Sequence, residues 1–308
     1  MFIMMNAARY AVGVQGIAVA ERAYQKAAEY ARDRVQSRPV DGSINASAPI
    51  VHHPDVRRML MTMRALTEGC RAMASVAAAA YDAAHHHPDA EVRRQNQAFY
   101  EFMVPLVKGF STEMSLEVTS LGVQVHGGMG FIEETGAAQY YRDARILPIY
   151  EGTTAIQAND LVGRKTARDG GQVAKAIAAQ IEQTEGELAR RESAAAKAVL
   201  RRLSAARKAF VEVVDFIARE TRGNPNAAFA GSVPYLLMAG NLVAGWQLAR
   251  SLMVAEDLAA RGEDPAFMQA KIATARFYAE HILPRVPAAR DAIVEGAESV
   301  MAMAVDAF

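Results

Sequence analysis

The sequence predicts an all-α protein in which a four-helix bundle is followed by a second helical domain. Apolar residues recur at three- and four-residue spacing through segments rich in Ala, Met, Leu and Arg, which is the pattern of long amphipathic helices. The alternating pattern of a strand is almost absent. A hydrophobic fraction of 51% in 308 residues supports a sizeable buried core.

The first predicted helices run from Ala7 to Arg34 and from Val56 to Ala84. Proline-containing breakers separate them from each other and from a third helix, which begins after His87-Pro-Asp. We expect this third helix to run to about Leu121 and to be kinked at Pro105.

A glycine-rich stretch, Gln124-Val-His-Gly-Gly-Met-Gly-Phe, follows the third helix. Three glycines in four positions end a helix and permit a ligand to approach the backbone closely. A fourth long helix is predicted from near Thr153 to Asp169-Gly-Gly, a polar stretch typical of a linker. We therefore predict two domains, residues 1–168 and 169–308.

The second domain is also predicted to be helical, and its helices are long with short connections, which favours antiparallel bundles. The predicted segments are Gln172 to Glu192, Ser193 to Glu220, Val233 to Arg261, Ala266 to Ile282 and a last helix that begins after Pro287 and ends near the terminus.

Composition excludes several classes of function. The 34 Lys and Arg balance the 34 Asp and Glu, so no global field attracts nucleic acid or an anionic membrane surface. The apolar start of the chain is interrupted by Asn6 and Arg9 before it reaches the length of a membrane span or a secretory segment. The single cysteine, Cys70, cannot form an intramolecular disulfide, which fits a reducing compartment, and we predict a cytoplasmic protein.

No metal site is predicted, although the chain contains His85-His86-His87. Consecutive residues on a helix point about 100° apart and cannot converge on one ion. Solvated helix ends are the simpler interpretation. Arginine pairs such as Arg57-Arg58 are interleaved with acidic residues and lack an aromatic platform, so they indicate ordinary surface rather than a nucleic-acid face.

The stretch Tyr150-Glu-Gly-Thr-Thr-Ala-Ile-Gln resembles the acyl-CoA dehydrogenase family. Arg9 with its helix to Arg34, the glycine-rich stretch from Gln124, and Tyr141-Arg-Asp-Ala-Arg-Ile agree with the family in order and spacing. The resemblance covers roughly residues 1 to 165 and implies the family's carboxyl-terminal four-helix domain. The region after Asp169 looks like the extra helical domain of family members of about 600 residues.

The resemblance implies that Glu151 is the catalytic base, which removes the α-proton of an acyl-CoA while the β-hydrogen leaves as hydride to FAD. A thioester α-proton is only weakly acidic, so a positioned carboxylate is needed, and an apolar pocket would raise its pKa toward a useful value. Without the resemblance, such a glutamate is most simply a solvated residue at a helix start.

Other site residues follow from the same resemblance, position by position. The predicted cofactor contacts are Arg34, Gln124, His126, Gly127, Gly128 and Thr153, and the predicted substrate contacts are Asn6, Arg9, Tyr150 and Gly152. Arg34 is equally well interpreted as a cation at a helix carboxyl end. In the family, Arg34 and the glycine-rich loop contact the flavin of a neighbouring subunit, so a homodimer or higher oligomer is implied. An electron acceptor such as electron-transfer flavoprotein is implied as well.

Two departures from the family pattern concern the cofactor: Val35-Gln36-Ser37-Arg38 lacks an aromatic flavin contact, and Ala155 replaces a polar residue. The family's amino-terminal helical domain and middle β-domain have no counterpart in these 308 residues. We expect those domains in cis or from a partner chain, with a truncated gene model, a split gene and a fragment all left open. The alternative function is a helical dimerisation or interaction module without catalysis.

Overall fold

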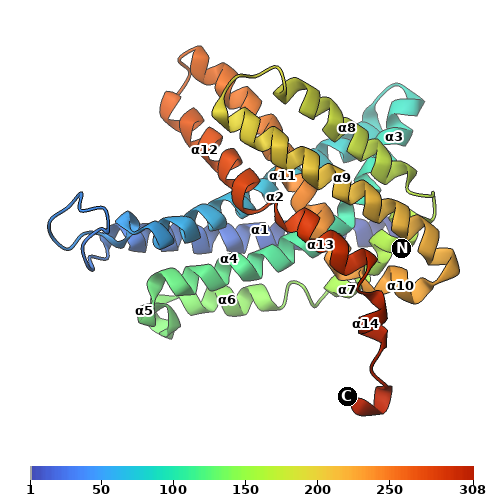
Figure 1. The fold of residues 1–308 in the computed structure, drawn as a ribbon, viewed down its shortest axis with the longest axis horizontal. Helices are drawn as coiled ribbons and strands as arrows, with labels where there is room; N and C mark the ends of the chain where they lie inside the picture. The colour runs from blue at the N-terminus through green and yellow to red at the C-terminus, as the bar shows by residue number, and fades with distance from the viewer. Residues whose placement is uncertain (1) are drawn as a thin grey trace.

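The computed structural model describes residues 2–308, and every regular element among them is a helix (Figure 1). Within those residues, extended pairing is limited to one isolated bridge between Val35 and Pro49. The all-α class predicted from the sequence is therefore confirmed.

Four long helical stretches form the first half of the chain. They are α1 (Phe2–Asp33), α2 (Pro54–His86), α3 (Ala90–Pro105) continued through the π-helical turn η2 (Leu106–Phe110) into α4 (Ser111–His126), and α7 (Thr154–Asp160) continued into a second π-helical segment, η4 (Leu161–Ala167). The short elements η1 (Ile50–His52), α5 (Gly128–Phe131), η3 (Glu133–Thr135) and α6 (Ala137–Arg145) connect them. Helix α1 packs along α4 and η2, and α2 packs against α1, α3 and α4.

Three features of this half differ from the sequence prediction. Instead of a simple kink, the helix widens into η2 directly after Pro105, which has no N–H to donate to the preceding turn. Helix α4 continues to His126, so Gln124 and His126 lie on a helix and not in a loop. Helix α6 was not predicted because it is short and polar, and its packing against α1 and α4 supplies what its own sequence lacks.

The second half is built from helices whose starts carry capping residues. Ser193 accepts a hydrogen bond from the Ala196 amide at the start of α9, and Asp264 accepts one from the Phe267 amide at the start of α12. The elements are α8 (Gln172–Leu188), α9 (Ala194–Gly223), α10 (Pro225–Ala230), α11 (Ser232–Ala260), α12 (Pro265–His281), α13 (Arg285–Val294), α14 (Ala297–Met301) and η5 (Val305–Ala307). The predicted last helix is wrong at its end, because α13 stops at Val294.

Helix α11 lies at the centre of the molecule and joins the two halves. Most residues between Tyr235 and Ala255 are buried, and the helix packs on α9, α12 and α13 as well as on α2, α7 and η2. One continuous hydrophobic core therefore runs from Ile17 to Ile293. The division at residue 168 stays a prediction. Although α11 is strongly apolar, no helix among residues 2–308 is long and apolar enough to cross a membrane.

Candidate functional site

The predicted site residues fall into two groups at opposite ends of α1 (Figure 1). In the first group, the Tyr150 hydroxyl donates to the side-chain oxygen of Gln15, near the middle of α1. In the second group, the Tyr30 ring stacks on His126 with ring centroids 4.4 Å apart. Because a helix rises 1.5 Å per residue, these two contacts on α1 are about 22 Å apart. The chain brings together Glu151 and its neighbours, but it does not bring them to Arg34 and the glycine-rich turn.

Glu151 occupies a turn whose backbone is left-handed. Its φ is 55° and that of Gly152 is 89°. A non-glycine residue at positive φ is uncommon and is often found at functional sites. A Cβ at position 152 would come within 2.8 Å of Gln157 Nε2, so this conformation and this contact both require glycine.

Hydrogen bonds from two buried residues, Lys108 and Gln157, hold the Glu151 turn in place. Lys108 Nζ donates to the carbonyl oxygens of Leu147 (2.9 Å) and Gly152 (2.7 Å). Gln157 Nε2 also donates to the Gly152 carbonyl oxygen, at 3.2 Å. These bonds join the turn to η2 on one side and to α7 on the other.

Lys108 is a fully buried cation beneath this turn. Burial lowers its pKa from 10.5 to about 8, and the nearby carboxylates of Glu113 and Glu151 oppose that shift, while Arg9 adds to it. Glu113 also accepts a 2.5 Å hydrogen bond from the Thr154 hydroxyl. The turn is thus surrounded by charged groups from α1, η2 and α4.

Arg9 and Asn6 lie three residues apart on α1 and so share one face of that helix. Arg9 Nη1 is 3.5 Å from Asp160 Oδ2, and its buried Nε has no hydrogen-bond partner within the described chain. Asn6 is half-buried. Arg9 is therefore near the Glu151 turn, as its effect on Lys108 also indicates.

Exposed apolar side chains flank the Glu151 turn in the chain. Ile146, Ile149 and Ile156 are 53%, 44% and 49% exposed. We call these three residues the apolar face. The Glu151 side chain itself is exposed. The expectation of an enclosed carboxylate is therefore not met in this chain by itself, because the turn lies at the surface.

Thr153 caps α7 at the end of the same turn. Its hydroxyl oxygen accepts a 3.4 Å hydrogen bond from the Ile156 amide. The O–H hydrogen of Thr153 remains available to donate, because the capping interaction uses only the oxygen.

The second group lies where α4 ends. Gly127, with φ 60° and ψ −140°, terminates the helix in a conformation essentially restricted to glycine, and no atom lies within 4 Å of a Cβ built at Gly127 or Gly128. Gln124 is exposed on the last turn. The backbone at Gly127 and Gly128 therefore borders open space, which a ligand needs in order to approach it closely.

His126 and Arg34 differ in their surroundings. The His126 ring is buried, its Nδ1 donates to the Gly122 carbonyl oxygen (2.7 Å), and burial lowers its pKa. It lines a cavity of about 340 Å³ together with Tyr30. Arg34 is exposed just after α1, and its guanidinium has no partner among the described residues.

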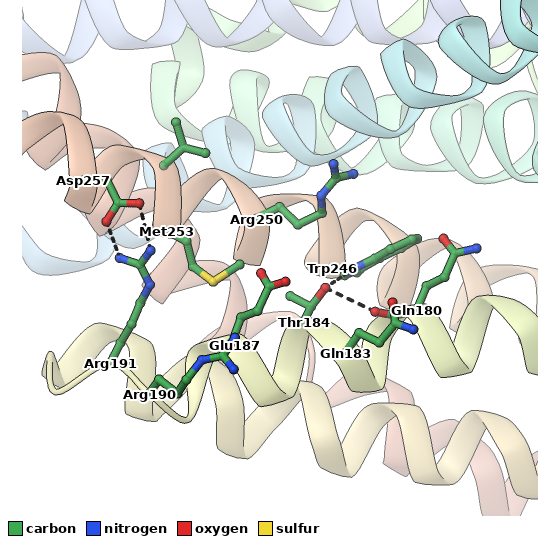
Figure 2. Close-up of a pocket in the computed structure, with 11 residues that line it drawn as sticks. Gln180, Gln183, Thr184, Glu187, Arg190, Arg191, Trp246, Arg250, Met253 and Asp257 are labelled. Carbon is green, nitrogen blue, oxygen red and sulfur yellow. Dashed lines mark hydrogen bonds and ion pairs between the residues drawn. The ribbon is translucent and has the colours of Figure 1, made fainter.

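A cavity of about 840 Å³ lies between α8 and α11 and includes none of the predicted site residues (Figure 2). Arg191 closes one end through two hydrogen bonds to Asp257 (2.8 and 2.9 Å), and Trp246 Nε1 donates to the Thr184 hydroxyl (2.8 Å). Across residues 2–308, no group of three or more His, Cys, Asp or Glu is placed to hold a metal ion.

The family described as "Acyl-CoA dehydrogenase, C-terminal domain" matches residues 3–165, which include both groups of site residues and more than half of the chain. The chain belongs to the acyl-CoA dehydrogenase family. A second family description, "Acetyl-CoA dehydrogenase C-terminal like", matches residues 172–304.

Several relatives resemble the chain over nearly its whole length. A 3-methylmercaptopropionyl-CoA dehydrogenase from Ruegeria pomeroyi is 58% identical over 98% of the chain and 51% of the relative. A broad-specificity linear acyl-CoA dehydrogenase from Mycobacterium tuberculosis is 34% identical over 95% of the chain and 50% of the relative. The chain thus spans about half the length of these acyl-CoA dehydrogenases.

A solved structure shows the same fold. An acyl-CoA dehydrogenase from Bacillus anthracis, crystallised with FAD, matches 98% of the chain and 51% of its own chain, with a TM-score of 0.69 and 21% identity. At that identity the match establishes the arrangement of helices only.

Sequence reasoning missed the residues that hold the Glu151 turn: Lys108, Glu113 and Gln157. One signal was present, because Lys108 is the lone charge in the apolar stretch Met103-Val-Pro-Leu-Val-Lys-Gly-Phe. A lysine in such a stretch, three residues after a proline, indicates a buried cation that requires acceptors. The identity of those acceptors could not be inferred, since they lie about 40 residues further along the chain.

Proposed function

We propose that the chain is the carboxyl-terminal portion of a FAD-dependent acyl-CoA dehydrogenase that oxidises an acyl-CoA to a trans-2-enoyl-CoA, with Glu151 as the base. The observation that carries this proposal is the Glu151 turn. In a chain of this family, a glutamate in a left-handed conformation lies in a turn bonded by the buried Lys108 and is flanked by the apolar face.

Glu151 would remove the α-proton, and the electron pair of the C–H bond would become the new carbon–carbon double bond as the β-hydrogen leaves with its electrons. The apolar face would exclude water around the carboxylate once substrate covers it, which makes the carboxylate a stronger base. The backbone N–H of Glu151 has no protein acceptor among the described residues, so it is free to bond the thioester oxygen.

FAD, when bound, supplies the acceptor for the β-hydrogen as hydride. The residues present fit this cofactor: the open space beside Gly127 and Gly128 admits a close ligand, and the unpaired guanidinium of Arg34 suits a pyrophosphate. The Thr153 hydroxyl retains a donor for the flavin end. We propose that His126 supports the neighbouring glycines Gly127 and Gly128, because its ring is buried and its Nδ1 already bonds the Gly122 carbonyl.

We further propose that two copies of the chain assemble around each cofactor. The separation of about 22 Å along α1 supports this arrangement, since Arg34 of one copy and Glu151 of another would then serve one flavin. Acyl-CoA as substrate, an electron-transfer flavoprotein as acceptor, and the two further domains that complete such an enzyme belong to the same proposal.

The test joins this chain to the amino-terminal half of the Ruegeria pomeroyi relative and compares the parent with Glu151→Gln. Glutamine preserves size and the backbone donor but removes the base, so anaerobic flavin bleaching by saturating acyl-CoA should slow by orders of magnitude. Acyl-CoA binding should survive. The matched control is Glu134→Gln, which neutralises another exposed glutamate and should bleach at the parental rate.

Bleaching of Glu151→Gln at close to the parental rate would show that Glu151 is not the base. If the parental fusion binds flavin and acyl-CoA but does not bleach, the alternative of a non-catalytic helical interaction module is favoured instead.

A further inference from the structure

We propose that Lys108 is a positioning residue for Glu151, because it ties together the two ends of the turn that carries the carboxylate. This inference rests on the proposed role of Glu151 as base. Lys108 does not touch substrate, since its side chain is fully buried.

The two acceptors of Lys108 lie on either side of Glu151. The Leu147 carbonyl is four residues before it and the Gly152 carbonyl is one residue after it, and one ammonium group bonds both, at 2.9 and 2.7 Å. Since each bond fixes one end of the turn, the direction in which the Glu151 side chain leaves the backbone is set by the position of Nζ.

The tie also sets where the turn lies relative to the rest of the fold. The backbone bonds of the turn, such as that from the Thr154 amide to the Pro148 carbonyl (3.0 Å), remain within the turn and the start of α7, and its links to Gln15 and Glu113 are made by side chains. Lys108 comes instead from η2, which packs against α1, α11 and α7. The lysine therefore holds the turn in register with the helix that carries Arg9.

The π-helical turn that presents Lys108 is itself tightly held. A Cβ at Gly109 would lie 2.6 Å from Leu236 of α11 and 3.2 Å from Gln157 of α7, and a Cβ at Gly13 of α1 would lie 2.2 Å from the Val107 carbonyl oxygen. The point from which the lysine reaches the turn is thus fixed from three sides.

A buried ammonium destabilises a fold unless it is well hydrogen-bonded, and an apolar side chain at position 108 would fill the same space. A lysine has three donors on a long stem and can bond two carbonyls from different places at once. Methionine would match its apolar length but hold neither carbonyl. Comparing lysine with methionine at position 108 therefore tests the effect of the two hydrogen bonds to the turn.

Hydrogen exchange of the full chain tests the tie without any catalytic readout. In Lys108→Met, the hydrogen-bonded amides among residues 147–156, such as those of Ile149, Tyr150 and Thr154, should exchange about tenfold or more faster, while those of α9 and α11 keep the parental rate. The matched control is Lys165→Met. Lys165 lies on the second π-helical segment, is partly buried and bonds Glu101 at 2.9 Å, so its loss should leave the exchange rates of residues 147–156 unchanged.

Unchanged exchange at 147–156 in a folded Lys108→Met chain would overturn the proposal, as would an equal increase throughout the chain. Should the methionine variant fail to fold, Lys108→Gln provides the same test, because glutamine is too short to reach both carbonyls and should still loosen the turn selectively.

Flavin reduction in the fusion enzyme provides the second readout. Lys108→Met should lower the reduction rate about tenfold or more while the acyl-CoA dissociation constant stays within about twofold, because the base is displaced and the binding surface is not. If Lys108→Met reduces flavin at the parental rate although residues 147–156 exchange faster, then Lys108 holds the turn but does not position Glu151 for catalysis. A Glu151→Gln enzyme that still reduces flavin normally would reject Glu151 as base and leave the exchange result unaffected.

Discussion

The stability of the parent chain relative to a Lys108→Met variant should rise as the pH increases from about 8 to about 10.5. Burial lowers the pKa of Lys108 from 10.5 to about 8, so over this range the unfolded chain binds the proton and the folded chain does not. The stabilisation that neutral Lys108 contributes is therefore complete above pH 10.5, its pKa in the unfolded chain. It is lost as the pH falls through about 8, its pKa in the folded chain. Methionine binds no proton and removes this dependence.

Integrating the linkage between the two pKa values gives a relative gain of about 2–3 kcal/mol for the parent between pH 7 and pH 10. Urea unfolding followed by circular dichroism at several pH values measures it. Burial also raises the pKa of Tyr100 and of Cys70 to about 12. The difference between parent and variant cancels their contribution, because both chains contain these groups.

The same series with Lys165→Met gives the control, since that lysine is only partly buried and paired with Glu101. A parent-minus-variant difference for Lys108→Met that stays constant to within about 0.5 kcal/mol over this pH range would refute the reasoning. It would mean that Lys108 is hydrated or compensated in the folded chain to the same degree as in the unfolded chain.

Further predictions concern glycines and the single thiol. Gly13→Ala should destabilise the chain by about 1–3 kcal/mol in urea unfolding, because its Cβ would lie 2.2 Å from the Val107 carbonyl oxygen. Gly186→Ala, in an open helical position, should stabilise it by up to about 1 kcal/mol, and equal effects of the two changes would contradict this. Gly152→Ala should cost about 1–3 kcal/mol, since φ is 89° and the neighbouring contact is close; an unchanged unfolding midpoint would count against the strain. Cys70 is buried and burial raises its pKa to about 12, so a thiol reagent should label it only after unfolding, and rapid labelling of the folded chain would show that the site opens.

Local sequence signals were sufficient for the long helices. Capping residues such as Ser193 and Asp264 act on amides three residues away, and apolar periodicity acts within a few turns, so both are visible in the sequence. Glu151 was predicted as the base because Tyr150-Glu-Gly-Thr-Thr resembles a family motif. The end of α4 was predicted at about Leu121, just before Gly122. The residues near Gly122 do not indicate that packing carries the helix to His126.

Contacts between distant segments were decided only by the tertiary structure. Lys108 and the Gly152 carbonyl are 44 residues apart, and nothing near either residue specifies the other. The same is true of the exposure of Glu151 and of the separation of the two site groups along α1, both of which depend on how α4, α6 and α7 pack. The sequence by itself determined which long segments are helical, because periodicity and capping act over a few residues, and the family resemblance of the stretch around Glu151 determined which glutamate is the candidate base. Only the fold decided what holds that glutamate in place, because burial and long-range hydrogen bonding exist only once the helices have packed.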